Sequence, residues 1–388
     1  MDFTLSPEHE ALRRLVREFA ENEVRPVAKA IDREHRVPME NLKKAAKLGL
    51  LGVPFPQEYG GMGAGETGYC ILMEELGRVC TSTATCIGAH IGIGAMSIYL
   101  DGTEEQKRKY LTPLAQGEKI AAFALTEPGA GSDAAAIRTR AVREGDSYIL
   151  DGMKHFITNG GFADIVTVLA VTNPALGARG GITAFIVETH WEGFKVAGAA
   201  NKMGIRGTDT AELVFEDLRV PEENVLGRVG EGFATFMKAL DLGRLTLGAA
   251  CLGGAQAALE ASIAWAKART AFGRPLAHMQ TIQWMIADMA TEIEALRSLV
   301  YRTAWLVDTG RPFSREAAMC KLYGSEVASR AIDRTLQIYG ALGYSREAEI
   351  ERMFRDARIA EIFEGTNEIQ RFVIAAQIFR EAGVRIRP

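Results

Sequence analysis

Apolar residues at helical spacing dominate the chain up to about residue 120. Ser6-Pro7 followed by acidic residues is a typical helix start, with serine as the N-cap and proline in the first turn. A glycine-rich break at 60–65 interrupts the pattern, and helices are predicted to resume at Glu66 and near Thr103. The apolar positions of the first predicted helix recur three and four residues apart, as one helix face requires. They are Leu12, Leu15, Val16 and Phe19.

The period changes in the middle of the chain, where short runs rich in β-branched residues replace the helical spacing. Ser147–Leu150 and Met153–Thr158 flank Asp151-Gly152, a favoured two-residue turn, and this pattern predicts a hairpin. Because no clear helix separates the runs, the sheet should be antiparallel, a β-sandwich or barrel and not a parallel wound sheet. The clearest runs are 165–171, 183–187 and 213–215.

Helical spacing returns from about residue 231, for example at Phe233, Phe236, Met237 and Leu240. The stretch Leu245–Leu259 is uncharged and rich in alanine and glycine, which predicts a buried helix, for example between subunits. We therefore expect an α+β multi-domain fold. The predicted domains are an N-terminal α-helical domain at 1–120, a middle antiparallel β-domain at 121–230 and a C-terminal α-helical bundle domain at 231–388.

The composition is that of an ordinary globular protein, with 47% hydrophobic and 24% charged residues, and excludes disordered and fibrous chains. Lys and Arg number 45 against 49 Asp and Glu, a net charge of -4, so nucleic acid is not expected as a partner. The five cysteines include no CxxC pair and the histidines no HExxH motif. We expect no disulfide framework, no metal and a reducing compartment.

The N-terminus is acidic and has neither an apolar signal core nor an Arg-rich transit pattern, so a cytoplasmic location is expected. Val79–Leu100 contains no Asp, Glu, Lys or Arg and is long enough to span a bilayer. It is rich in Ser, Thr and Gly and contains His90, which makes a poor lipid-facing surface. We therefore expect a buried helix here and no membrane span.

Gly129-x-Gly131-x-x-Ala134 matches the dinucleotide-binding fingerprint as a string. A Rossmann fold needs a helix after this string, and the predicted hairpin stands there instead, so a nicotinamide dehydrogenase is disfavoured. A plain turn is the simplest interpretation. Glycines at this position still allow the backbone to approach a ligand, and Thr126 and Ser132 add hydroxyl groups.

Two further motifs combine aromatic or basic residues with glycine. Phe156-Ile157-Thr158 precedes Asn159 and two glycines, and its ring and hydroxyl could flank a flat heterocycle or simply end a strand. Arg269 begins the string Arg-Thr-Ala-Phe-Gly-Arg at the end of a long helix. An arginine suits bidentate phosphate binding, although basic residues near a helix C-terminus are also favourable through the helix dipole alone.

The segment Glu361–Gln370 has the richest chemistry. Asn367 with Gln370 three residues later fits a capping box, which predicts a helix start, and helix N-termini bind anions. Glu364 then lies on the preceding loop beside Phe363. A carboxylate beside aromatic rings can be desolvated, which raises its pKa as a general base requires. A solvated loop glutamate is the alternative.

Taken together in order and spacing, these motifs resemble those of the acyl-CoA dehydrogenases over nearly the whole chain. The resemblance implies an α-helical domain, a middle β-domain and a C-terminal four-helix bundle, usually assembled as a homotetramer with one FAD per subunit. The motifs are Ala124-Leu-Thr-Glu-Pro-Gly-Ala-Gly-Ser-Asp133, Lys202-Met-Gly-Ile-Arg-Gly-Thr208, Leu240-Asp-Leu-Gly-Arg244, Arg269-Thr-Ala-Phe-Gly273, Gln337-Ile-Tyr-Gly-Ala341 and Ile362-Phe-Glu-Gly-Thr-Asn-Glu-Ile-Gln370.

The resemblance also implies three groups of site residues. The flavin ring would be lined by Phe123, Ala124, Leu125, Thr126, Gly131, Ser132, Phe156, Ile157 and Thr158. The rest of the FAD would be held by Arg269, Phe272 and Gln280, by Gln337, Ile338, Tyr339, Gly340 and Ala341 of a neighbouring subunit, and by Thr366, Asn367 and Glu368. The acyl-CoA would meet Ser132, Asp241, Leu242, Gly243, Arg244 and Gly365.

Glu364 matches the catalytic base of the family. The resemblance implies that it removes the pro-R α-proton of an acyl-CoA thioester while the β-hydrogen leaves as hydride to the flavin, giving a trans-2-enoyl-CoA. A site without water would keep this carboxylate basic. Electrons would then pass to an electron-transfer flavoprotein, in fatty-acid or branched-chain amino-acid catabolism.

Three positions qualify the resemblance. Phe156 and Phe363 stand where many members carry Trp and Tyr, and both keep a ring. Long-chain and isovaleryl members place the base at the position of Gly243, so this chain resembles the short-chain and short-branched members. An acyl-CoA oxidase that uses oxygen and a non-catalytic scaffold protein are the alternative functions.

Overall fold

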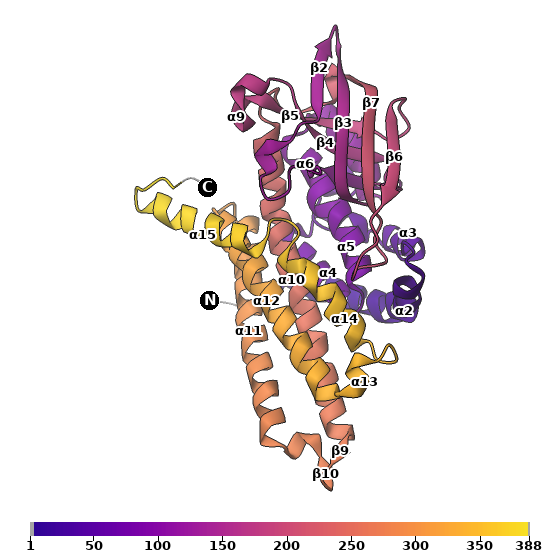
Figure 1. Cartoon of the computed structure of the whole chain (residues 1–388), viewed down its shortest axis with the longest axis vertical. Coiled ribbons are helices and arrows are strands. Elements are labelled where there is room, and N and C mark those ends of the chain that lie inside the picture. Colours follow the sequence, from indigo (N-terminus) through magenta and orange to yellow (C-terminus); the bar gives the residue numbers. More distant parts are fainter. Residues whose placement is uncertain (1–3, 387–388) are drawn as a thin grey trace.

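The computed structural model describes residues 4–386 and confirms the predicted order of helices, sheet and helices (Figure 1). The first helix begins as predicted, because the Ser6 side chain accepts a hydrogen bond from the amide of His9 and Pro7 follows. The N-terminal helices are α1 (Pro7–Phe19), α2 (Arg25–Glu34), α3 (Met39–Lys47), α4 (Gly65–Gly77), α5 (Thr81–Gly88), α6 (Met96–Asp101), α7 (Glu104–Gln106) and α8 (Thr112–Ala115).

The uncharged stretch after Val79 is helical and buried, as predicted. The π-helical segment η4 (Ala89–Ala95) joins α5 to α6 without a break. By length and composition alone, Thr81–Asp101 and Gly232–Ala268 are apolar enough to cross a membrane. In the described part of the chain, 72% and 56% of their most apolar windows are buried against other elements, so both serve as core helices.

The middle region forms one hydrogen-bonded sheet of eight strands in the order β6-β7-β3-β2-β4-β5-β8, with β1 beside β4. A single residue pair joins β2 to β4, and the two halves on either side share one core, in which Tyr148 packs edge-on against Phe185. The packing is therefore that of the predicted sandwich. The strands are β1 (Ala121–Ala124), β2 (Arg140–Glu144), β3 (Ser147–Thr158), β4 (Ile165–Val171), β5 (Ile182–Glu188), β6 (Phe194–Ala199), β7 (Thr210–Pro221) and β8 (Val225–Leu226).

Two predictions about this sheet are wrong in detail. The sheet is not wholly antiparallel, because β1 and the first residue of β2 pair parallel to β4. The predicted hairpin at Asp151-Gly152 is absent, since β3 runs straight through it with a bulge against β7. Gly152 is instead needed for close packing: a Cβ atom there would lie 2.7 Å from the Cα of Thr139.

The C-terminal region is built on the long helix α10, which extends from the sheet to the opposite end of the molecule (Figure 1). Its Ala- and Gly-rich part is buried within this chain, because Gly253 and Gly248 allow the backbones of α4 and α12 to approach closely. The remaining elements are α10 (Gly232–Ala268), the short strands β9 (Thr270–Ala271) and β10 (Arg274–Pro275), α11 (Gln280–Asp308), α12 (Ser314–Tyr339), α13 (Ala341–Tyr344), α14 (Ile350–Ala357) and α15 (Asn367–Glu381), with the 3-10 helix η10 (Arg358–Glu361).

The start of α15 differs from prediction by one residue. Thr366 is the N-cap and its hydroxyl accepts a hydrogen bond from the amide of Ile369, while Asn367 is the first helical residue. Asn367 is buried, and its side-chain oxygen accepts hydrogen bonds from Lys321 and Ser325 on α12. The asparagine therefore fixes α15 to α12, which leaves the neighbouring threonine to cap the helix.

Candidate active site

Glu364 lies on the tight loop between η10 and α15. Its backbone φ is 54° and that of Gly365 is 88°, so two successive residues adopt the left-handed conformation that side chains other than glycine disfavour. The side-chain amide of Gln370 holds this loop by donating to the backbone carbonyl oxygens of Glu364 at 3.2 Å and Gly365 at 2.9 Å. A backbone held in such a conformation by its surroundings is typical of functional sites.

The carboxyl group of Glu364 is desolvated. Its Oε2 atom is buried and has no hydrogen-bond partner among the described residues. Burial raises the pKa of Glu364 to about 7, against the opposing effect of the positive charges of Arg244 and Lys321. A carboxylate with a pKa near neutrality and no bonded partner is suited to accept a proton from a substrate.

The predicted substrate-binding residues of α10 lie directly beside this carboxylate. A Cβ atom at Gly243 would lie 2.7 Å from Glu364 Oε2 and 3.2 Å from the side chain of Ile93 on η4. The guanidinium of Arg244 donates to the Glu364 carbonyl oxygen at 3.3 Å and forms an ion pair with Asp241 at 2.7 Å. Leu242 is buried in the helical core.

Lys321 was not identified from the sequence. It is fully buried on α12, donates to Asn367 at 2.8 Å, and burial lowers its pKa to about 8. In the sequence, Lys321 simply follows the apolar run 317–320. A lysine on the protein surface would give the same pattern, so the sequence does not indicate that this one is buried. Its positive charge counteracts part of the burial effect on Glu364.

The residues predicted to line a flavin ring come together at the ends of β1 and β3. The amide of His155 donates to the carbonyl oxygen of Thr126 at 2.8 Å, which sets the two strand ends side by side. Phe156 has a φ of 57° and is 57% exposed, so its ring stands out from the sheet although its neighbour Ile157 is buried. Thr126 and Thr158 are partly exposed.

The glycine-rich loop after Thr126 is open. Cβ atoms at Gly129 and Gly131 would have no atom of the described chain within 4 Å, and Ser132 is exposed beside them. The loop is not followed by a Rossmann helix but by a single 3-10 turn, Ala134–Ala136. Glycines with free space around them are what a backbone needs if a ligand is to lie against it.

A buried ion pair that the sequence did not reveal holds this loop. Glu127 accepts hydrogen bonds from Lys154 at 2.8 Å and from the backbone and hydroxyl of Thr139, while Lys154 also donates to the carbonyl oxygen of Leu125. Lys154 is fully buried and Glu127 nearly so. The pair links β3 to both ends of the glycine-rich loop, so the loop has a fixed starting point.

The strand ends and the Glu364 region are joined through α10. The ring of Phe123 on β1 stacks on Phe236 of α10, with 4.0 Å between ring centroids. Phe236 lies two helical turns before Gly243 on the same helix. The residues predicted to line the flavin ring and those predicted to meet the acyl-CoA therefore both border α10 within one chain.

Most residues predicted to hold the rest of the FAD lie far away, at the other end of the longest axis of the molecule (Figure 1). Arg269, Phe272 and Gln280 surround the β9–β10 turn, where Phe272 is 96% exposed. The segment Gln337–Ala341 lies at the same end of the chain, since Tyr339 stacks on Trp265 of α10 with 4.8 Å between centroids. One copy of the chain does not bring this group to the strand ends. Within that segment, Ile338 is buried. Thr366 and Glu368, which were also predicted to hold FAD, lie at the start of α15.

Comparison with known proteins gives matches along the whole molecule. Residues 6–118, 122–218 and 230–379 match the N-terminal, middle and C-terminal domains of acyl-CoA dehydrogenase. The short-chain specific acyl-CoA dehydrogenase of Clostridium acetobutylicum is 48% identical over 98% of this chain and 100% of its own. An acryloyl-CoA reductase (NADH) of Anaerotignum propionicum is 47% identical over 98% of this chain and 96% of its own.

Solved structures agree with these matches. Butyryl-CoA dehydrogenase from Megasphaera elsdenii superposes with a TM-score of 0.96 at 41% identity, covering 98% of this chain and 100% of its own. A chain from a structure of the electron transferring flavoprotein of Acidaminococcus fermentans also gives 0.96, at 44% identity and with coverage of 98% and 100%. An acyl-CoA dehydrogenase complexed with FAD from Bacillus anthracis gives 0.91 at 38% identity, with coverage of 98% and 68%. With all three domains matched and identity of this level over nearly its full length, the chain belongs to the acyl-CoA dehydrogenase family.

Proposed function

We propose that this protein is an FAD-dependent dehydrogenase of an acyl-CoA thioester and that Glu364 is its catalytic base. The observation that carries the proposal is the desolvated, unpartnered carboxyl oxygen of Glu364 directed at Gly243. The absence of a side chain at Gly243 lets the Glu364 carboxylate lie close to α10. The substrate thioester is placed beside this unpartnered oxygen. Glu364 takes the α-proton on Oε2, and the product is the trans-2-enoyl-CoA.

The residues of the chain fit FAD. The open glycine-rich loop, the exposed ring of Phe156 and the hydroxyls of Thr126 and Thr158 offer a flat surface with hydrogen-bonding groups. FAD, when bound, accepts the β-hydrogen of the substrate as hydride. Because Arg269 and the Gln337–Ala341 segment lie at the far end of the chain, the pyrophosphate and adenosine contacts come from a second copy, consistent with a homotetramer.

Arg244 and Gln370 keep the base in place. Both donate to the backbone around Glu364, so its carboxylate stays on the loop in one orientation while the proton moves. Proton abstraction tolerates little misplacement, since catalysis depends on near-attack geometry. Lys321, through its charge, keeps the pKa of Glu364 from rising further.

The wider setting follows from the relatives. An electron-transfer flavoprotein is proposed as the electron acceptor, supported by the similar chain found in a structure of such a flavoprotein. Bacterial relatives and the burial of both long apolar helices support a cytoplasmic protein without a membrane span. If oxygen were the acceptor instead, acyl-CoA-reduced flavin would be reoxidised rapidly in air.

The deciding experiment is flavin bleaching by a panel of acyl-CoAs with the wild type and Glu364→Gln. The amide keeps the shape of the side chain and removes the base, so bleaching should slow by on the order of 10²–10⁴-fold while binding persists. Glu361→Gln, on the same segment but hydrogen-bonded to Ser329 and Arg358, is the matched control and should bleach normally. A wild-type bleaching rate in Glu364→Gln would exclude Glu364 as the base.

The nearly equal identity to an acryloyl-CoA reductase makes the direction of the reaction a separate question. The same proton-transfer group serves both directions. Reduction of an enoyl-CoA by chemically reduced enzyme, compared with oxidation of the saturated thioester, measures which direction is faster.

A further inference from the structure

Beyond the catalytic carboxylate, α4 and η4 both pack against α10. Glu364 Oε2 faces Gly243, and Ile93 of η4 closes the same point from the other side. An acyl chain whose α-carbon meets Oε2 has its remaining carbons directed away from the loop carrying Glu364. One helical turn further along α10 is Thr246, and next to Ile93 on η4 is Gly92.

Tyr69 of α4 occupies that next position. It is fully buried, and its hydroxyl donates to the carbonyl oxygen of Gly88 at 3.2 Å. A Cβ atom at Gly92 would lie only 2.6 Å from the tyrosine oxygen. Burial raises the pKa of Tyr69 well above its ordinary value, and the neighbouring Thr246 hydroxyl and Glu364 charge also act on it, so the phenol lies near the same stretch of α10 as Gly243.

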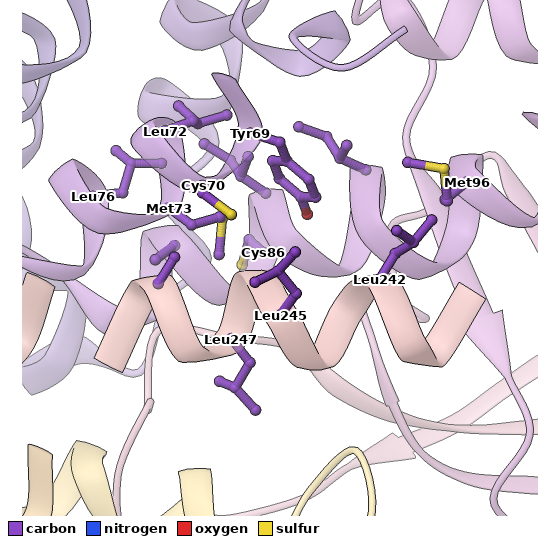
Figure 2. Packing of buried hydrophobic residues seen from close by; sticks show 14 of the residues in the cluster. Tyr69, Cys70, Leu72, Met73, Leu76, Cys86, Met96, Leu242, Leu245 and Leu247 are labelled. Atoms are coloured by element: carbon purple, nitrogen blue, oxygen red, sulfur yellow. The ribbon is translucent and has the colours of Figure 1, made fainter. Parts of the chain in front are cut away.

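Met73, one turn after Tyr69 on α4, approaches Gly88 as the tyrosine hydroxyl does. Its methyl carbon would lie 2.9 Å from a Cβ atom at Gly88. Glycines at positions 88 and 92 thus make room for two large side chains that enter from α4. Figure 2 shows Tyr69 extending from α4 toward α10, where Leu242 and Leu245 lie, with Met73 beside it.

We propose that Tyr69, backed by Met73, is the residue that limits acyl-chain length: its ring forms the closed end of the pocket that begins at Glu364. The substrate class is then short acyl thioesters, with butyryl-CoA preferred over octanoyl-CoA. This inference rests on the proposed function, since it assumes that the acyl chain enters from Glu364.

The variants Tyr69→Ala and Tyr69→Leu open this end by different amounts. Each added methylene that a hydrophobic pocket accommodates changes specificity by roughly 10-fold or more. The ratio of kcat/KM for octanoyl-CoA to that for butyryl-CoA should therefore rise at least about 10-fold in Tyr69→Ala and less in Tyr69→Leu. Tyr69→Phe keeps the ring and should keep the wild-type ratio.

Binding is measured separately in a Glu364→Gln background, from the change in flavin absorbance on titration with octanoyl-CoA. The added Tyr69→Ala change should tighten octanoyl-CoA binding relative to butyryl-CoA. Phe55→Ala is the control for loss of a buried aromatic ring, because Phe55 is fully buried but packs against Tyr99 instead. It should lower thermal stability without moving the ratio.

The outcomes are distinct. An unchanged ratio in folded, FAD-containing Tyr69→Ala and Tyr69→Leu would overturn the assignment, and so would a Tyr69→Phe variant that shifts like Tyr69→Ala. A wild type that already prefers octanoyl-CoA would also overturn it. Failure of every acyl-CoA to bleach the wild-type flavin would instead refute the proposed function on which it rests.

Discussion

The surroundings of the Glu364 side chain determine how tightly it binds a proton. Burial raises its pKa from 4.5 to about 7, and the charges of Arg244 and Lys321 oppose this effect without cancelling it. The carboxyl oxygen that faces Gly243 has no hydrogen-bond partner in the described structure that would stabilise its ionised form. At the residue scale, the site therefore combines a strong enough base with a carboxyl oxygen that no described residue hydrogen-bonds.

The raised pKa predicts how activity depends on pH. The base must be ionised to accept a proton, so kcat/KM for flavin reduction should fall about tenfold per pH unit below about 7. A pH profile of flavin bleaching measures this. In Glu361→Gln the same inflection should remain, and an inflection near 4.5 would mean that Glu364 is solvated in the working enzyme.

The same shift predicts an effect on stability. Because the folded chain binds the Glu364 proton more tightly than the unfolded chain, the free energy of unfolding falls as pH rises from about 4.5 to about 7. Above pH 7, Glu364→Gln should therefore be more stable than the wild type, by roughly 1–3 kcal/mol. Urea unfolding at pH 8 and at pH 4 measures it, and the gain should nearly vanish at the lower pH, which lies below the pKa of the unfolded chain.

The position of Gly243 predicts that the base can be moved. A Cβ atom there points at the Glu364 carboxylate, so the two positions reach one point in space. Gly243→Glu combined with Glu364→Gly should recover part of the dehydrogenation that Glu364→Gly loses, and glycine also suits the positive φ at 364. The recovery should be partial, with an altered chain-length preference, because the new side chain occupies acyl space.

Gly243→Gln with Glu364→Gly is the control for this exchange, since it fills the same space without a carboxylate. Flavin bleaching by several acyl-CoAs is the measurement. If the glutamate double variant folds and binds FAD but gains nothing over the glutamine control, position 243 does not face the reacting carbon.

At the scale of elements, buried polar contacts decide how strands and loops meet. Lys154 on β3 joins Glu127 at the start of the glycine-rich loop, and the same lysine reaches the end of β1 through Leu125. The positive charge of Lys154 lowers the pKa of Glu127 despite burial, while burial lowers the pKa of Lys154 to about 8. The loop proposed to bind FAD is therefore anchored by an ion pair in which each charged group favours the ionised form of the other.

Removing one of these charges should be costly. Lys154→Met leaves the Glu127 carboxylate buried without its partner, and loss of one member of a buried pair typically costs about 3–5 kcal/mol. Urea unfolding should show this loss together with weaker FAD retention. Adding Glu127→Gln removes the unpaired charge and should restore part of the stability; no restoration would mean that packing of the lysine, and not the charge pair, holds the loop.

At the scale of the whole molecule, the residues proposed for FAD lie at two ends of one elongated chain (Figure 1). The strand ends with Phe156 are at the sheet, and Arg269 with Phe272 is at the tip beyond α10 and α11. At this tip the ring of Phe272 is 96% exposed in the single chain. The complete FAD site is therefore expected only in an assembly.

This arrangement predicts that FAD binding depends on protein concentration. Dilution to the monomer should release FAD, while Arg269→Ala should weaken FAD binding even in the assembled protein because a phosphate contact is lost. Analytical ultracentrifugation that follows flavin and protein absorbance together measures both, and mass spectrometry identifies the released chromophore. FAD that stays bound to a monomer, or FMN as the chromophore, would contradict the two-copy site.

The sequence by itself determined the order helix, sheet, helix and the approximate starts of α1, α4, α7 and α15, because hydrophobic periodicity and capping are local properties of a chain. The start of α15 was predicted to within one residue, and the buried helix after Val79 was predicted correctly. The resemblance to acyl-CoA dehydrogenases, now confirmed, also rested on short strings that keep their order along the chain.

Only the tertiary structure decided how distant segments meet. The Asp151-Gly152 string favours a turn locally, but pairing of β3 with β7 overrode it. Arg244 contacts Glu364 across 120 positions, and Lys321 reaches Asn367 across 46, so neither contact has a periodic signal in the sequence. The pKa of Glu364 and the position of Tyr69 against Gly88 depend on which helices pack together, because desolvation and shape exist only once the chain has folded.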